Sequence, residues 1–315
     1  MLETLGVQSQ VVSVVDNNCI DKEVYDFKPT HVFVEALWVV PSKFEVLLPK
    51  YSKVKWYVRT HSNSPFISNE GMAFEWFDGY NLLKTKYDNF NIAPNSLKLV
   101  NELKLSMGIN CDYTPNIYKP LEYQDDKKYK NPMIHRNKNI INIACFGAIR
   151  PMKNQLLQAM AAIGFADEID KILHFHINCA RFEQYGEPIY RNIKNLFVNN
   201  RKHKLIEHSW VGHEEFIKII KRMDIGMQVS FTETFNIVSA DFAYNDVPLV
   251  GSREVEWLNY LYKAHPTEID HIIDRLWIAH YGRKIGLQEL NKCGLISYNL
   301  NALEAWKKLL SINFI

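Results

Sequence analysis

The fold of the second half is decided by residues 140–178, which read IINIACFGAIRPMKNQLLQAMAAIGFADEIDKILHFHIN. Two short apolar runs, Ile140–Phe146 and Ile172–Asn178, are rich in β-branched and aromatic residues, so we predict two buried strands. Between them, Asn154–Phe165 has the pattern of a helix. A strand, a helix and a second strand in this spacing predict a βαβ unit in a parallel sheet.

The same alternation extends in both directions from this stretch. Toward the C-terminus we predict, in order, helix Ile189–Val198, strand Lys204–His208, helix Glu214–Arg222, strand Asp224–Val229, helix Ile237–Tyr244 and strand Val247–Gly251. Toward the N-terminus we predict strands Val11–Asp16, His31–Ala36 and Val54–His61, and helix Pro94–Met107. The end of the chain, Thr267–Leu310, is expected to be wholly helical.

These elements predict an α/β protein with two Rossmann-like domains that face a cleft. The 315 residues suit two domains of about 150 residues each. We expect an N-terminal domain over 1–138, which ends in a polar linker at about 118–138. A second domain is expected over 139–265, and residues 266–315 are expected to form C-terminal helices that cross back to the first domain.

Composition and charge exclude several classes of protein. Apolar residues make up 47% of the chain and the formal net charge is +2, which excludes a disordered or histone-like chain. The 18-residue run richest in apolar residues contains two glutamates, a lysine and a proline, so no membrane span is expected. The five cysteines form no CxxC pair, and the first ten residues do not resemble a signal peptide. We therefore expect a cytoplasmic protein without a zinc site.

Polar residues follow the predicted strands of the first half. Ligands of open parallel sheets bind at the carboxyl ends of the strands, where Asp16, Glu35 and His61 are expected. His61 lies in THSNSPF among small hydrogen-bonding residues, so it is the strongest candidate of the three. The alternative is that these residues are polar only because they lie in loops.

The first strand of the second half ends in FGAIRPMKNQ. Gly147 allows the backbone to pass close to a ligand, and Arg150 and Lys153 bring two cations to the start of the next helix. Cations at this end of a helix are unfavourable unless an anion binds there, and phosphate is the obvious anion. The alternative is that both side chains extend into water.

A second candidate segment is FTETFNIVSAD, which follows the predicted strand Asp224–Val229. Glu233 lies in the turn, and the backbone amides of Thr234–Asn236 lead into a helix, where free N–H groups can hold a phosphate. Asp241 comes eight residues after Glu233, about two helical turns further on. The two carboxylates suit two groups of hydroxyls, such as those of a sugar and a ribose.

With these motifs, the second half resembles the donor domain of GT-B glycosyltransferases, specifically glycosyltransferase family four. Gly147, Arg150 and Lys153 match the family's diphosphate-binding segment, and Glu233 and Asp241 match its E-x7-E motif. The resemblance covers about residues 9 to 260, and the run is also similar to uncharacterised glycosyltransferases of tailed phages. Asp241 replaces the usual Glu, and the family's opening strand and glycine-rich loop are shortened or missing.

The resemblance implies a function for each matching residue. Arg150, Lys153 and the amides of Thr234, Phe235 and Asn236 would bind the donor diphosphate, Glu233 the sugar and Asp241 the ribose. His61 matches the family's histidine in the first domain, and Asp16 and Glu35 are placed on the acceptor side. Retention of configuration and independence of metal are also implied. No cofactor is expected besides the nucleotide-sugar substrate.

The sequence therefore predicts a glycosyltransferase that uses a nucleotide-diphosphate sugar and an acceptor that the sequence does not identify. The acceptor could be a phage or host glycan or modified DNA. Basic clusters occur at 50–56, 126–130 and 201–204; they are most simply solvated loops, and they would matter if the acceptor were DNA. Three alternatives stay open: a nucleotide-sugar-binding protein without activity, a DNA-binding protein, and an epimerase of the same fold. The motifs of nicotinamide-binding, P-loop, zincin and α/β-hydrolase sites are absent from the sequence. Trp38, Trp56, Trp210 and Trp257 are expected in the core.

Overall fold

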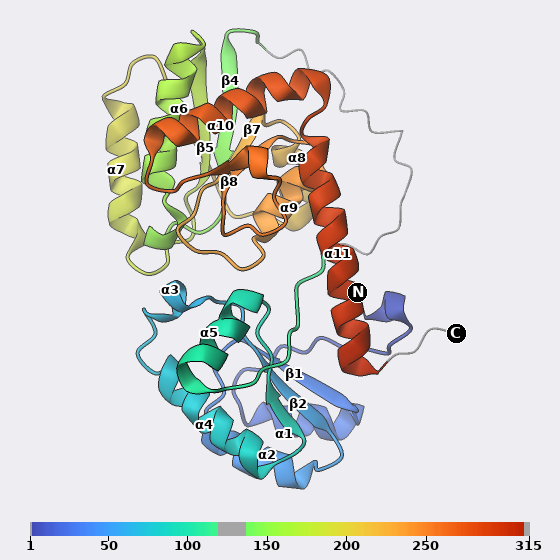
Figure 1. Cartoon of the computed structure of the whole chain (residues 1–315). Helices are drawn as coiled ribbons and strands as arrows, with labels where there is room; N and C mark the ends of the chain where they lie inside the picture. The colour runs from blue at the N-terminus through green and yellow to red at the C-terminus, as the bar shows by residue number, and fades with distance from the viewer. Residues whose placement is uncertain (1, 119–136, 312–315) are drawn as a thin grey trace. The chain divides into compact units, whose positions relative to one another are not determined.

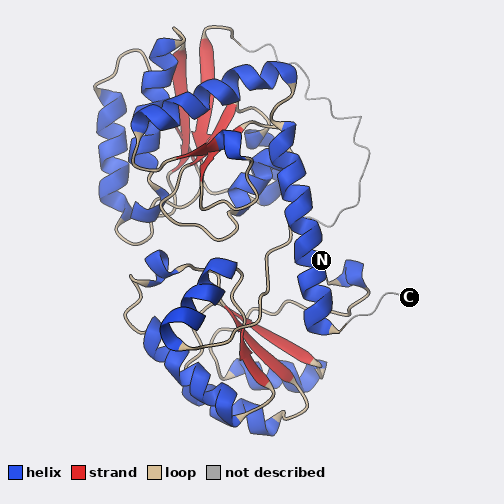
Figure 2. Ribbon diagram, in the orientation of Figure 1, coloured by secondary structure: helices blue, strands red, loops and turns tan. Residues whose placement is uncertain are grey.

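The structure is a computed structural model that describes residues 2–118 and 137–311 (Figure 1). Its internal contacts divide the chain into two units. Unit 1 comprises Met1–Pro120 together with Leu300–Ile315, and unit 2 comprises Leu121–Asn299. Each unit contains one parallel sheet flanked by helices, as predicted (Figure 2). The predicted linker at 118–138 lies almost wholly outside the described residues.

Unit 2 contains a six-stranded parallel sheet in the order β6-β5-β4-β7-β8-β9. This is the 3-2-1-4-5-6 order of a Rossmann fold, with the order reversing between β4 and β7. The strands are β4 (Ile140–Cys145), β5 (Ile172–Asn178), β6 (Lys204–His208), β7 (Ile225–Gln228), β8 (Leu249–Ser252) and β9 (Lys263–Ala264). The helices are α6 (Gln155–Glu168), α7 (Gly186–Val198), α8 (His213–Ile220), α9 (Ile237–Tyr244), α10 (Ile269–Gly282) and α11 (Glu289–Leu310). Short 3-10 turns are η3 (Pro151–Lys153), η4 (Tyr260–Tyr262) and η5 (Arg283–Ile285).

The sheet of unit 2 is buried on both faces at its centre. All four residues of β7 are buried, and Phe175 of β5 stacks on Phe197 of α7. Helix α9 packs directly on β7, because a Cβ at Gly226 would meet the ring of Phe242 at 2.6 Å. This close approach fixes the start of α9 beside the carboxyl ends of β4 and β7.

Unit 1 contains a three-stranded parallel sheet in the order β1-β2-β3. The strands are β1 (His31–Glu35), β2 (Lys55–Arg59) and β3 (Phe90–Ile92). The helices are α1 (Cys19–Phe27), α2 (Pro41–Lys50), α3 (Ser64–Ile67), α4 (Ala73–Lys86) and α5 (Leu97–Met107), preceded by the 3-10 turn η1 (Glu3–Leu5). One face of the sheet packs on α2 and α4, where Phe44 meets Trp56, Tyr80 and Phe90 edge-on or tilted.

The end of α11 belongs to unit 1. Trp306 donates from Nε1 to the carbonyl of Pro115 at 2.8 Å, and its ring lies 5.1 Å from that of Phe33 on β1. The guanidinium of Arg59 lies 5.7 Å from the same ring. These contacts cover part of the second face of the small sheet.

Most predicted elements are confirmed, but the strand at Val11–Asp16 is wrong. The structure gives this segment no strand pairing, and Val11 and Val15 are 99% and 93% exposed. Strand propensity reflects how a side chain fits a half-buried pleated surface. Among the described residues no neighbouring strand provides such a surface here, so the β-branched run stays extended and exposed.

Candidate functional site

The reversal of strand order in unit 2 marks where a ligand is expected to bind. The loop after β4 contains Gly147, whose φ of +116° favours glycine and whose N–H donates to Oδ1 of Asn178 at 2.9 Å. The loop after β7 leads into α9, with Asn236 at its N-cap. Both loops therefore lie at the carboxyl ends of adjacent strands, the position where open parallel sheets bind ligands.

Buried amide side chains fix these two loops to each other. Gln228 donates to the carbonyl of Phe146 at 2.7 Å, and Asn236 donates to Oε1 of Gln228 at 3.0 Å. Gln158 accepts from the backbone N–H of Val229 at 2.8 Å. Because satisfied buried polar groups are costly to separate, this network holds the two loops in a defined arrangement.

Lys153 and Glu233 form a buried ion pair across the two loops. Their side chains are only 11% and 7% exposed, and the ammonium of Lys153 donates directly to Oε1 of Glu233. The structure thus brings together two residues that the sequence predicted at one site, although they are 80 positions apart. An ammonium has three N–H donors, so the pairing leaves donors that can reach a further acceptor.

Arg150 forms an ion pair with a different carboxylate. Its guanidinium donates to Oε2 of Glu183 at 3.0 Å, and Arg181 pairs with the other oxygen of Glu183 at 2.7 Å. Backbone hydrogen bonds at 3.0 Å from Ile149 to Arg181 and from Glu183 to Ile149 join the loops after β4 and β5. In this structure the two predicted phosphate-binding cations are therefore held by different carboxylates.

A cavity of about 240 Å³ opens beside these loops. It is lined by Gly147, Asn178, Trp210, Val211, His213, Phe216, Val238 and Asp241. Asp241 is 1% exposed and accepts from Nε2 of His213 at 2.8 Å. A buried carboxylate beside aromatic and aliphatic side chains is the combination that small-molecule sites use, with a few polar groups that fix orientation.

Trp210 was expected in the core, and that expectation is wrong. The side chain lines the cavity and is 53% exposed, and the guanidinium of Arg181 lies 5.4 Å from its ring. Sequence reasoning also missed Asn178 and His213. Asn178 is the last residue of β5, so reading every strand end would have found it. Nothing in the sequence pairs His213 with Asp241.

A second group of predicted residues gathers in unit 1. Glu35, the last residue of β1, accepts from His61 and, at 2.9 Å, from Arg59. Arg59 also donates from Nε to the carbonyl of Thr114 at 3.0 Å. Burial would raise the pKa of Glu35, but the hydrogen bond from His61 and the charge of Arg59 lower it below its usual value. Glu35 and His61 thus form one polar group at the carboxyl end of the small sheet.

Asp16 was predicted to end a strand, and this is wrong: it precedes α1. Its Oδ1 accepts from the backbone N–H of Asn18 at 2.6 Å, and among the described residues no hydrogen bond or ion pair joins Asp16 to Glu35 or His61. This geometry explains Asp16 as a turn residue.

Residues 2–118 and 137–311 contain no group of three or more His, Cys, Asp or Glu side chains arranged to hold a metal ion. They also contain no helix that is both long and apolar enough to cross a bilayer.

Comparison with known proteins supports the fold. No family model matches the sequence, and the search of curated proteins gives no match. The structure is similar to an α,α-trehalose-phosphate synthase (UDP-forming) from Burkholderia xenovorans in complex with glucose-6-phosphate, with a TM-score of 0.70 and 11% identity over 94% of this chain and 76% of that one. It is also similar to an E. coli trehalose-6-phosphate protein bound with UDP-2-fluoro glucose, with a TM-score of 0.66 and 13% identity over 95% and 77%. These neighbours are GT-B glycosyltransferases, so the chain has the GT-B fold.

Proposed function

We propose that this chain is a glycosyltransferase that moves a sugar from a nucleoside-diphosphate sugar to an acceptor. The observation that carries the proposal is the cavity at the strand-order reversal of unit 2, with Gly147 at one wall and Asp241 at another. Rossmann folds bind nucleotides at this point of the sheet. The structural neighbours include a protein bound with UDP-2-fluoro glucose and one studied for glycosyl transfer with retention.

The geometry suggests how the donor would be held. Trp210 offers an exposed ring for the base, and the Asp241 carboxylate suits the vicinal hydroxyls of a ribose. Lys153 and the amides at the start of α9 would stabilise the diphosphate as negative charge develops on it during bond cleavage. Glu233, held by Lys153, would face the donor sugar.

Arg150 and His61 could contact the donor only through interactions that differ from those in this structure. Arg150 would have to leave Glu183 to reach a phosphate, and the carboxylate would then keep Arg181 as its cationic partner. His61 belongs to unit 1, whereas the donor cavity lies in unit 2. We include a contact between His61 and the donor sugar in the proposal. Glu35 would orient its ring. Retention, independence of metal, a cytoplasmic location and membership of family four belong to the same proposal.

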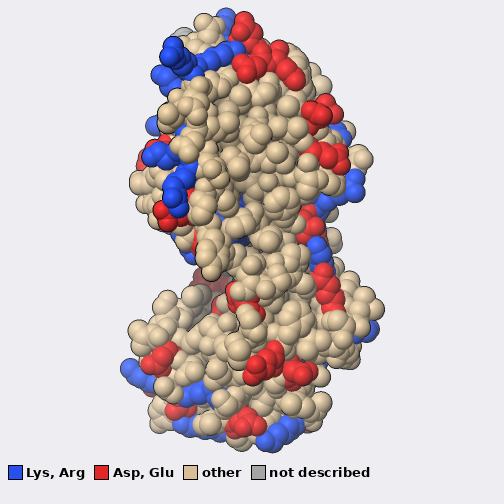
Figure 3. Space-filling model, turned by 90° about the vertical axis from the view of Figure 1, so that its left-hand side faces the viewer, with Lys and Arg blue, Asp and Glu red and all other residues tan. Residues whose placement is uncertain are grey.

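One specific observation favours a protein that binds donor without transfer. The sheet of unit 1 has three strands where that of unit 2 has six, and the predicted strand at Val11–Asp16 is absent from it. A DNA-binding role gains no comparable support. On the face shown in Figure 3, basic and acidic side chains are interspersed over both units and most of the surface is uncharged.

A donor screen tests the proposal. Wild-type protein would be titrated with UDP, GDP, ADP and dTDP by thermal shift and then assayed for hydrolysis of the matching nucleotide sugars. A ligand at 100 times its Kd adds about 2.7 kcal/mol to stability, which such a scan detects. Lys153→Ala should abolish turnover, while Lys202→Ala, on the surface, should not. Binding without turnover would favour the inactive form of the family, and turnover by Lys153→Ala would contradict the proposed role of this lysine.

A further inference from the structure

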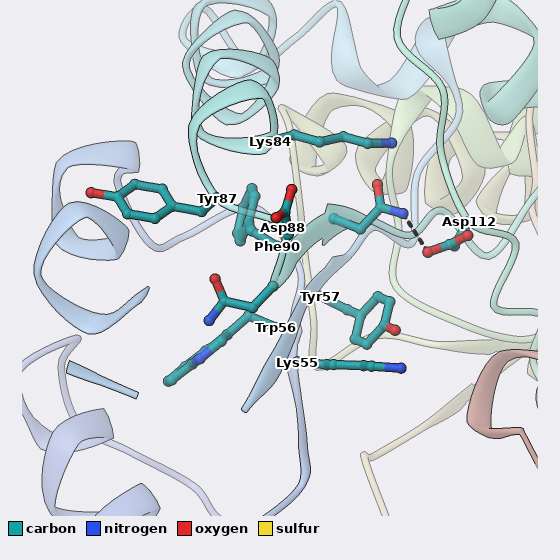
Figure 4. Close-up of a pocket in the computed structure, with 10 residues that line it drawn as sticks. Lys55, Trp56, Tyr57, Lys84, Tyr87, Asp88, Phe90 and Asp112 are labelled. Atoms are coloured by element: carbon teal, nitrogen blue, oxygen red, sulfur yellow. Dashed lines mark hydrogen bonds between the residues drawn. The ribbon is translucent and has the colours of Figure 1, made fainter. Parts of the chain in front are cut away.

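A second cavity, of about 320 Å³, lies in unit 1 and is not used by the proposed donor site (Figure 4). It opens at the amino ends of β2 and β3, beside the last turn of α4. Strands rise about 3.3 Å per residue, so the Cα atoms of Lys55 and Arg59 at the two ends of β2 are about 13 Å apart. The cavity is therefore at the opposite end of the sheet from Glu35 and His61.

The hydroxyl of Tyr57 points into this cavity (Figure 4). The residue is 6% exposed, and its ring stacks on Phe33 with centroids 4.8 Å apart. Among the described residues the hydroxyl makes no hydrogen bond. Burial and the nearby charge of Asp112 raise the pKa of this phenol, so it stays protonated and can donate. The ring is thus held in the core while its hydroxyl reaches the open cavity, where a ligand can accept from it.

The charges around the hydroxyl balance. Lys55 and Lys84 lie on either side of Tyr57, and their ammonium ends extend in the same direction as its hydroxyl (Figure 4). Asp88 and Asp112 also line the cavity. Two cations against two carboxylates do not select an anion such as a phosphate or a nucleic-acid backbone. The site instead offers strong donors and strong acceptors together.

Asn91 and Asp112 add further hydrogen-bonding groups to the wall of the cavity. Asn91 donates to the carboxylate of Asp112, which leaves the second oxygen of Asp112 on the same wall, while the amide oxygen of Asn91 accepts from the backbone N–H of Ile92 at 2.9 Å. Each hydroxyl of a sugar both donates and accepts, so a ring of hydroxyls matches a cavity that supplies both kinds of partner. The stacking of Tyr57 on Phe33 fixes its ring and so the direction in which its hydroxyl points.

We propose that this cavity binds a neutral sugar unit of a carbohydrate chain. This proposal rests on the proposed function and extends it, because it identifies the acceptor as a glycan. The cavity would bind a sugar unit of that glycan at a distance from the hydroxyl that receives the transferred sugar. The hydroxyl of Tyr57 and the carboxylate of Asp112 make the deciding contacts, and Lys55 and Lys84 hydrogen-bond hydroxyls at the rim.

The test is binding to a printed array of neutral oligosaccharides, with anionic oligosaccharides and a DNA duplex on the same surface and no donor present. Wild-type protein should bind neutral oligosaccharides preferentially. The neutral oligosaccharide with the strongest signal is then titrated by calorimetry. Tyr57→Phe and Asp112→Asn should each weaken its binding at least about tenfold, which corresponds to about 1.4 kcal/mol. Tyr25→Phe, at a tyrosine that is 67% exposed on α1, is the matched control and should bind as wild type does.

Three results would overturn the inference: no binding to any neutral oligosaccharide, a preference for DNA or anionic oligosaccharides, or unchanged affinity in both cavity variants. Circular dichroism of each variant separates lost contacts from lost folding, and Tyr57→Phe removes a single oxygen. The array contains no nucleotide sugar, so its result is independent of turnover. Donor hydrolysis by the wild type tests the proposed function separately, and either test can fail while the other succeeds.

Discussion

Replacing Lys153 with Met removes the positive charge beside the buried carboxylate of Glu233 while keeping most of the side-chain volume. Both side chains are about nine-tenths buried, and breaking such a pair costs about 3–5 kcal/mol. In a unit of this size each kcal/mol shifts Tm by about 2–4 °C. We therefore expect Lys153→Met to lower the Tm of unit 2 by about 6–20 °C in differential scanning calorimetry.

The double variant Lys153→Met with Glu233→Gln separates stability from function. It removes both charges together, so most of the lost stability should return, although donor turnover should stay absent because the diphosphate has lost its cation. Lys202→Met is the control, since its partner Asp167 is exposed and such surface pairs contribute at most about 1 kcal/mol. A single variant as stable as wild type, or a double variant that turns over donor, would refute this reasoning.

Three further predictions concern single side chains. Trp210→Ala should weaken nucleoside-diphosphate binding by about 5- to 150-fold, because base stacking contributes about 1–3 kcal/mol, and equal titration curves would exclude stacking. Burial, with His208 and His174 nearby, lowers the pKa of His176 to about 3, so stability should fall as pH decreases below 6.5. At pH 5 the loss should be about 2 kcal/mol, and a His176→Gln variant with the same pH dependence would contradict it. Glu35 has a lowered pKa, so its stabilisation is complete above its ordinary value of 4.5 and is lost in more acidic solution. Glu35→Gln should therefore unfold with a flatter acid dependence than wild type, and an unchanged acid dependence would contradict the role of its charge.

The sequence predicts the central strands of unit 2 well because they are buried on both faces. A run such as Ile172–Asn178 can pack only inside a sheet, and the observed strand has the same bounds. Val11–Asp16 has similar residues but no neighbouring strand among the described residues, and a partner cannot be read from composition. Helix α4 was not predicted, since its apolar residues show only weak helical periodicity and Gly79 interrupts them.

In the candidate site, too, residues with local sequence signals were predicted and residues placed by tertiary contacts were not. Gly147 was found because strand ends have local signals, and Asp241 was found from its spacing of eight residues from Glu233; both line the cavity. The pairing of Arg150 with Glu183 was not foreseen, because it depends on how two loops join across the edge of the sheet. Trp210 was assigned to the core by the general preference of tryptophan, but tertiary packing places it at the cavity.

The central claim is that the cavity between Gly147 and Asp241 binds a nucleoside diphosphate. Titration calorimetry of UDP, GDP, ADP and dTDP into wild type and Asp241→Asn tests it most directly. At least one diphosphate should bind wild type with a Kd well below about 1 mM, and the variant should bind it at least about tenfold more weakly. Absence of binding by all four, or equal affinity in the two proteins, would contradict it.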